Sequence, residues 1–222
     1  MKKNYLVALG AIALLVGGVV VASNMGFKLN KPLDGPGTNG SASGTQDIGL
    51  PFNQQTSLVN ASDLRADIVT EGGTGVSISR FNPQTDSLAT YAGISSANDF
   101  ALSPAEGYRV KLSNDVNYIV VGSHDPGLVL NLNGPGTSGS ASGSQLYSYP
   151  YHSTANAASQ LRDEILAQGG AGISLSVSRF NPQTDALATY AGLSSANDFA
   201  LAPGEAYVLK TSGDIAYVPS HY

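Results

Sequence analysis

Few residues of this 222-residue chain could do chemistry, and histidine comes first because only three are present. The sequence places Ser123, His124 and Asp125 side by side, and Ser220 precedes His221 near the C-terminus. A serine–histidine–acid relay needs a carboxylate that orients the imidazole and a nucleophile on a strained turn. Neighbouring residues of an extended segment point to opposite faces, so these residues are poorly placed to form a relay. The sequence therefore predicts a protein that is not an enzyme, with no catalytic residue to assign.

Two glycine-rich stretches resemble loops that wrap a phosphate: GPGTNGSASG from Gly35 to Gly44 and GPGTSGSASG from Gly134 to Gly143. A phosphate-binding P-loop continues into Lys-Ser or Lys-Thr, whereas these stretches continue into Thr45-Gln46 and Ser144-Gln145. The motif fails, so we expect each stretch to be a loop between two strands. A second role stays open, in which the loops bind a glycan together with the tyrosines that follow the second stretch: Tyr147, Tyr149 and Tyr151.

The acidic residues that stand out recur in pairs: Asp86 with Asp185, Asp99 with Asp198, and Glu106 with Glu205. A catalytic site is normally unique, so repeated acids indicate a requirement of the fold, in turns and at strand ends. We expect Arg80 and Arg179 to pair with Asp86 or Asp185 across a hairpin. Calcium stays open where acids and loop carbonyls converge, although the sequence lacks a dense acidic loop, and neither a metal nor a cofactor is assigned.

Charge and cysteine content exclude several classes of protein. The formal net charge is −5, only 12% of residues are charged, and lysine and arginine form no cluster, so nucleic acid is not an expected partner. The chain has no cysteine, which excludes disulfides and thiolate metal sites. An isopeptide cross-link would need a buried lysine, but Lys111 and Lys210 alternate with apolar residues and are expected to face the solvent.

The N-terminus has the pattern of an export signal. Two lysines are followed by an apolar run from Tyr5 to Val21 and then by small residues. This pattern predicts a signal peptide over residues 1–23, cut after Ala22 or Ser23. A retained membrane anchor is the alternative, because the apolar run is near the lower limit for spanning a bilayer. We expect the protein to be secreted, extracellular or at the cell surface.

An internal duplication organises the rest of the chain. The stretch that begins SRFNPQTDSLATYAG at Ser79 recurs as SRFNPQTDALATYAG at Ser178, and Gly35 and Gly134 have the same separation. We therefore divide the chain into module one, residues 24–125, and module two, residues 126–222.

Hydrophobic patterning predicts the elements of each module. Leu64 and Ile68, like their counterparts Leu161 and Ile165, give one apolar stripe on a short helix. We expect Ser62 to cap the first helix and Gly169-Gly170 to end the second. Alternating apolar residues then predict strands, with hairpins at NPQTD and at the Pro turn before Tyr108. The expected fold is mainly β, with two tandem antiparallel β-sandwich-like modules that each carry one short helix.

The junction between the modules matches the two ends of the chain. Phe27, Lys28 and Leu29 at the head resemble the start of module two, and the tail, which contains Tyr217, Val218, His221 and Tyr222, resembles the end of module one. If chains stacked head to tail, the junction would be rebuilt between them, and an open contact of this kind generates a filament. The first strand could also pair with the preceding subunit's sheet.

The chain contains the motifs SNMGFKL, RFNPQTD, NDFALSPAEGY, NDFALAPGEAY and VPSHY. These motifs are similar to those of secreted bacterial surface proteins built of tandem β modules with a PGEGY-like turn. The resemblance implies no catalytic residues. From the sequence we expect a structural subunit of an extracellular filament or surface layer whose partners are copies of itself. The alternative is a secreted or surface-attached binding module for glycans or a host surface.

Overall fold

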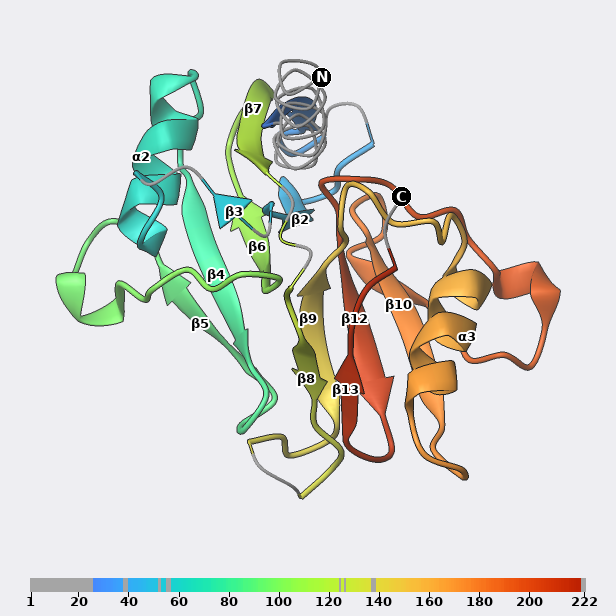
Figure 1. Cartoon of the computed structure of the whole chain (residues 1–222). Helices are drawn as coiled ribbons and strands as arrows, with labels where there is room; N and C mark the ends of the chain where they lie inside the picture. Colours follow the sequence, from blue (N-terminus) through green and yellow to red (C-terminus); the bar gives the residue numbers. More distant parts are fainter. Residues whose placement is uncertain are drawn as a thin grey trace, which may run out of the picture.

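The computed structural model describes residues 26–37, 40–51, 53–54, 57–123, 125, 127–136 and 139–220, which form antiparallel sheets flanked by two helices (Figure 1). The predicted signal segment, residues 1–23, lies outside the described residues, as do His124, His221 and Tyr222. Within the described part, no helix combines the length and hydrophobicity that crossing a membrane requires.

Module one contains two sheets, a helix and a short 3-10 helix. The four-stranded sheet has the order β2 (Thr45–Gly49), β6 (Gly107–Lys111), β4 (Ser77–Asn82) and β5 (Ser87–Tyr91). The three-stranded sheet has the order β1 (Phe27–Leu33), β7 (Val116–Ser123) and β3 (Asn53–Gln54). Helix α2 (Ala61–Thr70) packs beside β4, and η1 (Ser96–Asn98) follows β5. All strand pairs are antiparallel.

Module two repeats this plan with a smaller second sheet. Its four-stranded sheet has the order β9 (Ser144–Ser148), β12 (Ala206–Thr211), β10 (Leu175–Asn181) and β11 (Ala186–Tyr190). Strands β8 (Leu130–Leu132) and β13 (Ile215–Tyr217) form a pair, α3 (Ala158–Gln168) packs on β10 and β13, and η2 (Ser195–Asn197) follows β11. The predicted mainly β fold with two sandwich-like modules and one short α-helix in each is confirmed.

The helix ends differ in one respect from the prediction. The N-cap of α2 is Asn60 rather than Ser62, and the Asp63 carboxylate accepts the Asn60 main-chain N–H at 2.8 Å. Ser62 instead donates its own main-chain N–H to Asp99 at 2.9 Å, as Ser159 of α3 does to Asp198. These repeated acids therefore satisfy free N–H groups in the first turn of a helix, where the helix dipole also favours negative charge. Helix α3 ends at Gly169, as predicted.

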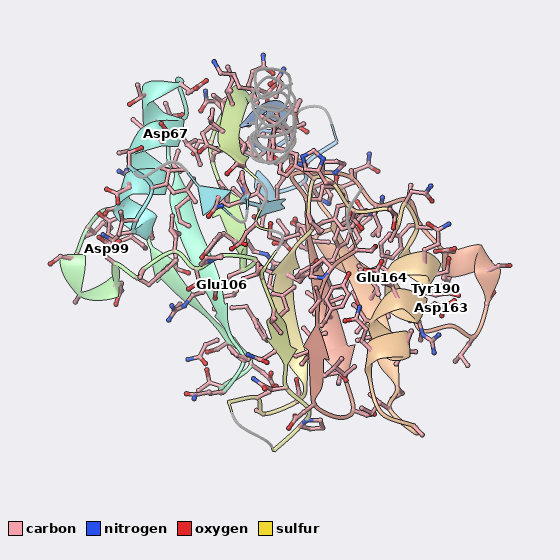
Figure 2. The ribbon with its side chains drawn as sticks, viewed as in Figure 1. Asp67, Asp99, Glu106, Asp163, Glu164 and Tyr190 are labelled. Carbon is pink, nitrogen blue, oxygen red and sulfur yellow. The ribbon has the colours of Figure 1, made fainter. Side chains whose placement is uncertain are left out.

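Tyrosines dominate the two cores, and five of them have rings that are almost fully buried: Tyr108, Tyr118, Tyr147, Tyr207 and Tyr217. A buried hydroxyl needs a hydrogen-bond partner. Tyr118 donates to Asp67 of α2 at 2.9 Å, and Tyr217 donates to Glu164 of α3 at 2.8 Å, so each phenol ties its helix to the sheet (Figure 2 labels both acids). Burial, reinforced by the neighbouring carboxylates, raises the pKa of both phenols well above the ordinary value.

The tyrosine core predicts a steep loss of stability in base. Because the folded pKa of Tyr118 and Tyr217 is raised, the neutral phenols stabilise the fold below about pH 10, and this contribution is lost as the pH rises above that value. Tyrosinate absorbance should therefore show an early phase from exposed tyrosines and a second, cooperative phase that coincides with the loss of near-UV circular dichroism. A single gradual titration of all 11 tyrosines with the dichroism intact would contradict the buried network.

Candidate functional site

The two modules meet through reciprocal main-chain hydrogen bonds. Gly49 N–H donates to Gly204 O at 3.0 Å, and Ser148 N–H, the counterpart of Gly49, donates to Ala105 O at 2.8 Å. Isolated antiparallel bridges join Ile48 with Glu205 and Glu106 with Tyr147. These main-chain contacts are thus repeated with the roles of the two modules exchanged. The halves of the chain are related by an approximate two-fold axis through this contact.

The glycine-rich loops belong to the same contact. As predicted, each connects two strands, β1 with β2 and β8 with β9. Each loop also reaches the NPQTD turn of the other module. Ser43 Oγ donates to Asp185 at 2.9 Å, and Ser142 Oγ donates to Asp86 at 2.8 Å. Main-chain bonds of 2.7 Å accompany them, from Ala42 to Pro182 and from Ala141 to Pro83. The repeated loop and the repeated turn are therefore the two halves of one inter-module clasp.

This clasp overturns the expected pairing of the hairpin arginines. Asp86 and Asp185 are occupied by serines of the opposite module. Arg80 Nε instead lies 3.8 Å from Glu106 of its own module, and the Arg179 guanidinium lies over the Phe199 ring at 5.1 Å. The prediction was wrong because the partner of each aspartate comes from the other module, far away in the sequence.

The two modules approach each other so closely that side chains are excluded at the contact. A Cβ atom on Gly49 would lie 2.5 Å from Glu205 O and 2.6 Å from Ser148 Oγ. A Cβ on Gly107 would overlap the Cβ of Ala206, its own counterpart in module two. Such distances are far below van der Waals contact. The crossing point of the two sheets therefore requires glycine in module one.

A buried ion pair lies beside this crossing point. Arg109 donates to both carboxylate oxygens of Asp47, at 2.7 and 2.9 Å, and its guanidinium stacks 4.3 Å from the Phe180 ring of module two. The Asp47 side chain is 2% exposed, so burial raises its pKa while Arg109 opposes the rise. The counterparts in module two are Leu146 and Val208.

Arg109 and Lys111 lie on the same face of β6, because they are two residues apart in the strand. Lys111 and its counterpart Lys210 are exposed as predicted, but Arg109 is half-buried beneath module two. The feature of the sequence that could have indicated the burial of Arg109 is Val208, the apolar residue at the matching position of module two. A position that is apolar in one repeat and charged in the other indicates a covered surface.

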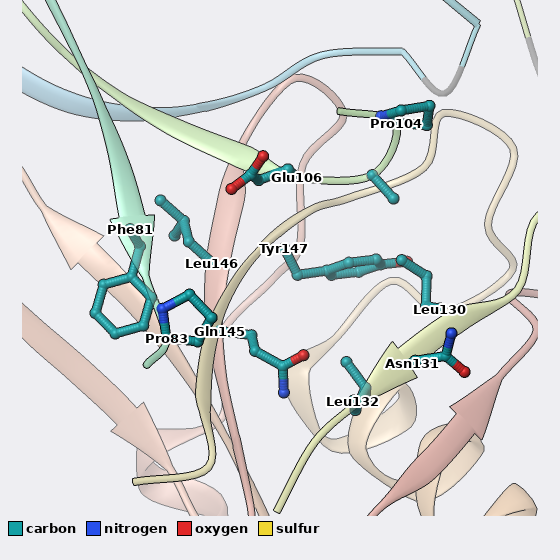
Figure 3. Close-up of a pocket in the computed structure, with 11 residues that line it drawn as sticks. Phe81, Pro83, Pro104, Glu106, Leu130, Asn131, Leu132, Gln145, Leu146 and Tyr147 are labelled. Carbon is teal, nitrogen blue, oxygen red and sulfur yellow. The ribbon is translucent and has the colours of Figure 1, made fainter. Parts of the chain in front are cut away.

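Two cavities flank the contact at matching places. One, of about 180 Å³, is bounded mainly by apolar side chains (Figure 3): Phe81, Pro83, Pro104, Leu130, Leu132, Leu146 and Tyr147, with Glu106, Asn131 and Gln145 as polar members. Its counterpart, of about 220 Å³, contains the Lys31–Glu205 ion pair, whose charged atoms are 3.6 Å apart. Lys31 replaces Leu130 in the matching position, so only the first cavity offers an apolar site for a small group.

A wider cleft of about 490 Å³ lies near the two-fold axis. It is lined by both Leu88 and its counterpart Leu187, and by both Arg109 and its counterpart Val208. Among the described residues, no three acidic or histidine side chains gather closely enough to hold a metal ion.

The predicted ligand tyrosines lie in different surroundings from those expected. Tyr147 and Tyr149 are buried in the core of module two, where they present no open ring face to a glycan. Tyr151 stacks against Phe27, with ring centroids 3.7 Å apart. This contact joins the first strand of module one to module two. Local patterning could not predict this contact, because the two residues lie far apart in the sequence and in different modules.

Those predicted inter-subunit residues that the structure describes make contacts within the chain. Phe27, Lys28 and Leu29 belong to β1, which pairs with β7 along its whole length. Tyr217 is buried and pairs with Leu130, whereas Val218 is 41% exposed and its main chain is bonded to Gln168 of α3.

No protein-family model, curated protein or solved structure matches the chain.

The ion pair and its apolar counterpart provide a stability test. Arg109→Val alone should lower the free energy of unfolding by about 3–5 kcal/mol, because it leaves the Asp47 carboxylate buried without its cation. Adding Asp47→Leu copies the residues of module two and should restore stability to wild type or above. Urea unfolding measures both values. A double variant as unstable as the single one would show that Phe180 stacking, rather than charge compensation, dominates the site.

Proposed function

We propose that the chain is a non-catalytic structural subunit that associates with copies of itself into an extracellular filament or surface layer. The approximate two-fold axis between the modules is the observation that carries this proposal. Because the axis relates the modules, whatever surface module one presents at its free end recurs on module two at the other end. Figure 1 shows the two free ends on opposite sides, one beside α2 and one beside α3.

Growth of a polymer from such subunits requires two equivalent ends on each subunit. A subunit with a single self-complementary patch stops at a dimer, whereas a subunit that presents such a patch at each end adds neighbours without limit. The low content of charged residues, 12%, also reduces the repulsion that copies would feel at close range. The export signal predicted over residues 1–23 would place the polymer outside the cell.

Electron microscopy of the exported protein tests this function. We expect negative-stain images of material collected from the medium to show filaments or sheets of regular thickness. N-terminal sequencing of the same sample should give subunits that begin near Ser23. Dispersed monomers that are retained on a polysaccharide column would instead favour the binding module. Monomers that bind no polysaccharide would leave neither function supported.

Exchange of the first strand is a separate route to assembly, and it can be tested independently. Exchange would require β1 to leave the seven pairs that it makes with β7 and its contact with Tyr151. Leu29 and Val120 are paired residues of these strands, and antiparallel partners are close enough for a disulfide. Leu29→Cys with Val120→Cys, in a chain that otherwise lacks cysteine, locks β1 in place.

We expect the oxidised lock variant to assemble as the wild type does, because β1 belongs to the three-stranded sheet and is not a strand of the four-stranded sheets. The reduced variant is the control. If oxidation abolished assembly and reduction restored it, strand exchange would be the joint between subunits.

A further inference from the structure

The outer edges of the two four-stranded sheets are open. Within the described part of the chain, β5 pairs only with β4, and β11 pairs only with β10. The first four residues of each strand are exposed on both faces of the sheet. A strand in this position presents unpaired N–H and C=O groups along one side.

Neither edge carries the protection that edge strands usually have. Folded proteins guard such strands with charged side chains, proline or bulges, since an unguarded edge pairs with other chains. Strand β5 reads SLATY and β11 reads ALATY, with no charged residue and no proline in either. Both strands also keep a regular antiparallel register of five residue pairs with their inner neighbours. They are therefore regular, uncharged edges to which a further strand could be added.

The opposite edges of the same sheets show what kind of partner suits this module. There, β2 and β9 are each bridged by main chain of the sister module, through Ile48 with Glu205 and Tyr147 with Glu106. A second copy of the module thus already closes one edge of each sheet. Among the described residues, this contact leaves β5 and β11 as the unpaired edges of the two four-stranded sheets.

We propose that β5 of one chain pairs in antiparallel fashion with β11 of the next, so that the four-stranded sheets continue from subunit to subunit. This inference rests on the proposed self-assembly, and it identifies the β5–β11 contact as the joint between subunits. The shared LATY residues would give both strands of the joint the same pattern of side chains.

Two apolar residues beside the strands fit the same joint. Ile94 follows β5 after a short turn and is 92% exposed, and its counterpart Leu193 follows β11 and is 93% exposed. Figure 1 shows these loops projecting at opposite sides, green beside β5 and orange-red beyond α3. A single exposed apolar residue is ordinary, but the same exposure at both ends of the molecule matches a surface that a neighbour covers.

Glutamates on the two edges test the joint without disturbing the fold. Ala89 lies opposite Arg80 in the β4–β5 pair, and Ala188 lies opposite Arg179 in the β10–β11 pair. Ala89→Glu with Ala188→Glu therefore gives each new carboxylate an arginine partner within its own chain. Between chains, the two glutamates meet as like charges. The matched control is Ala66→Glu with Ala167→Glu, the same charge change at exposed positions of α2 and α3.

We expect the edge variant to lower the polymer mass measured by light scattering by at least about tenfold, with an unchanged circular dichroism spectrum, while the helix control assembles like the wild type. Equal assembly by all three proteins would overturn the β5–β11 joint and leave the structural function standing. A wild-type protein that stays monomeric would overturn the structural function itself. If the edge variant and the helix control both failed to assemble, the cause would be net charge, and the β5–β11 joint would likewise be overturned.

Discussion

The close approach of the two modules is the constraint on which the rest of the structure depends. Reciprocal main-chain bonds from Gly49 and Ser148 bring the sheets so near that Gly107 has no room for a Cβ atom. The same approach lets each glycine-rich loop reach the NPQTD turn of the other module. It also bridges the inner edges of the four-stranded sheets, at β2 and β9, and leaves their outer edges, β5 and β11, unpaired among the described residues.

Within this approximate symmetry, the two copies have diverged where they face each other. Module one carries the Asp47–Arg109 pair, and module two carries Leu146 and Val208 in the same places. One flanking cavity is apolar, and the other holds the Lys31–Glu205 pair. At the first of these places, Arg109 of module one packs on the Phe180 ring of module two. This divergence favours the observed partner over pairing of two identical modules from different chains.

Local patterning predicted most of the fold within each module. The Leu64 and Ile68 stripe predicted α2, and alternating apolar residues predicted the strands that follow it. The contacts between modules could not be predicted in this way. The partners of Asp86 and Asp185 lie in the other module, and periodicity records only which face is apolar, not what covers it. Tyr147 and Tyr149 were misplaced for a related reason, since a tyrosine in a polar stretch fits a core as well as a surface.

The most direct test of the central claim is a cryo-electron microscopy reconstruction of the assembled protein. We expect each subunit to keep its internal two-fold contact and β5 of one chain to lie beside β11 of the next in a continuous antiparallel sheet. A reconstruction in which β5 and β11 stay unpaired while subunits join through β1, or in which the two modules separate, would contradict it.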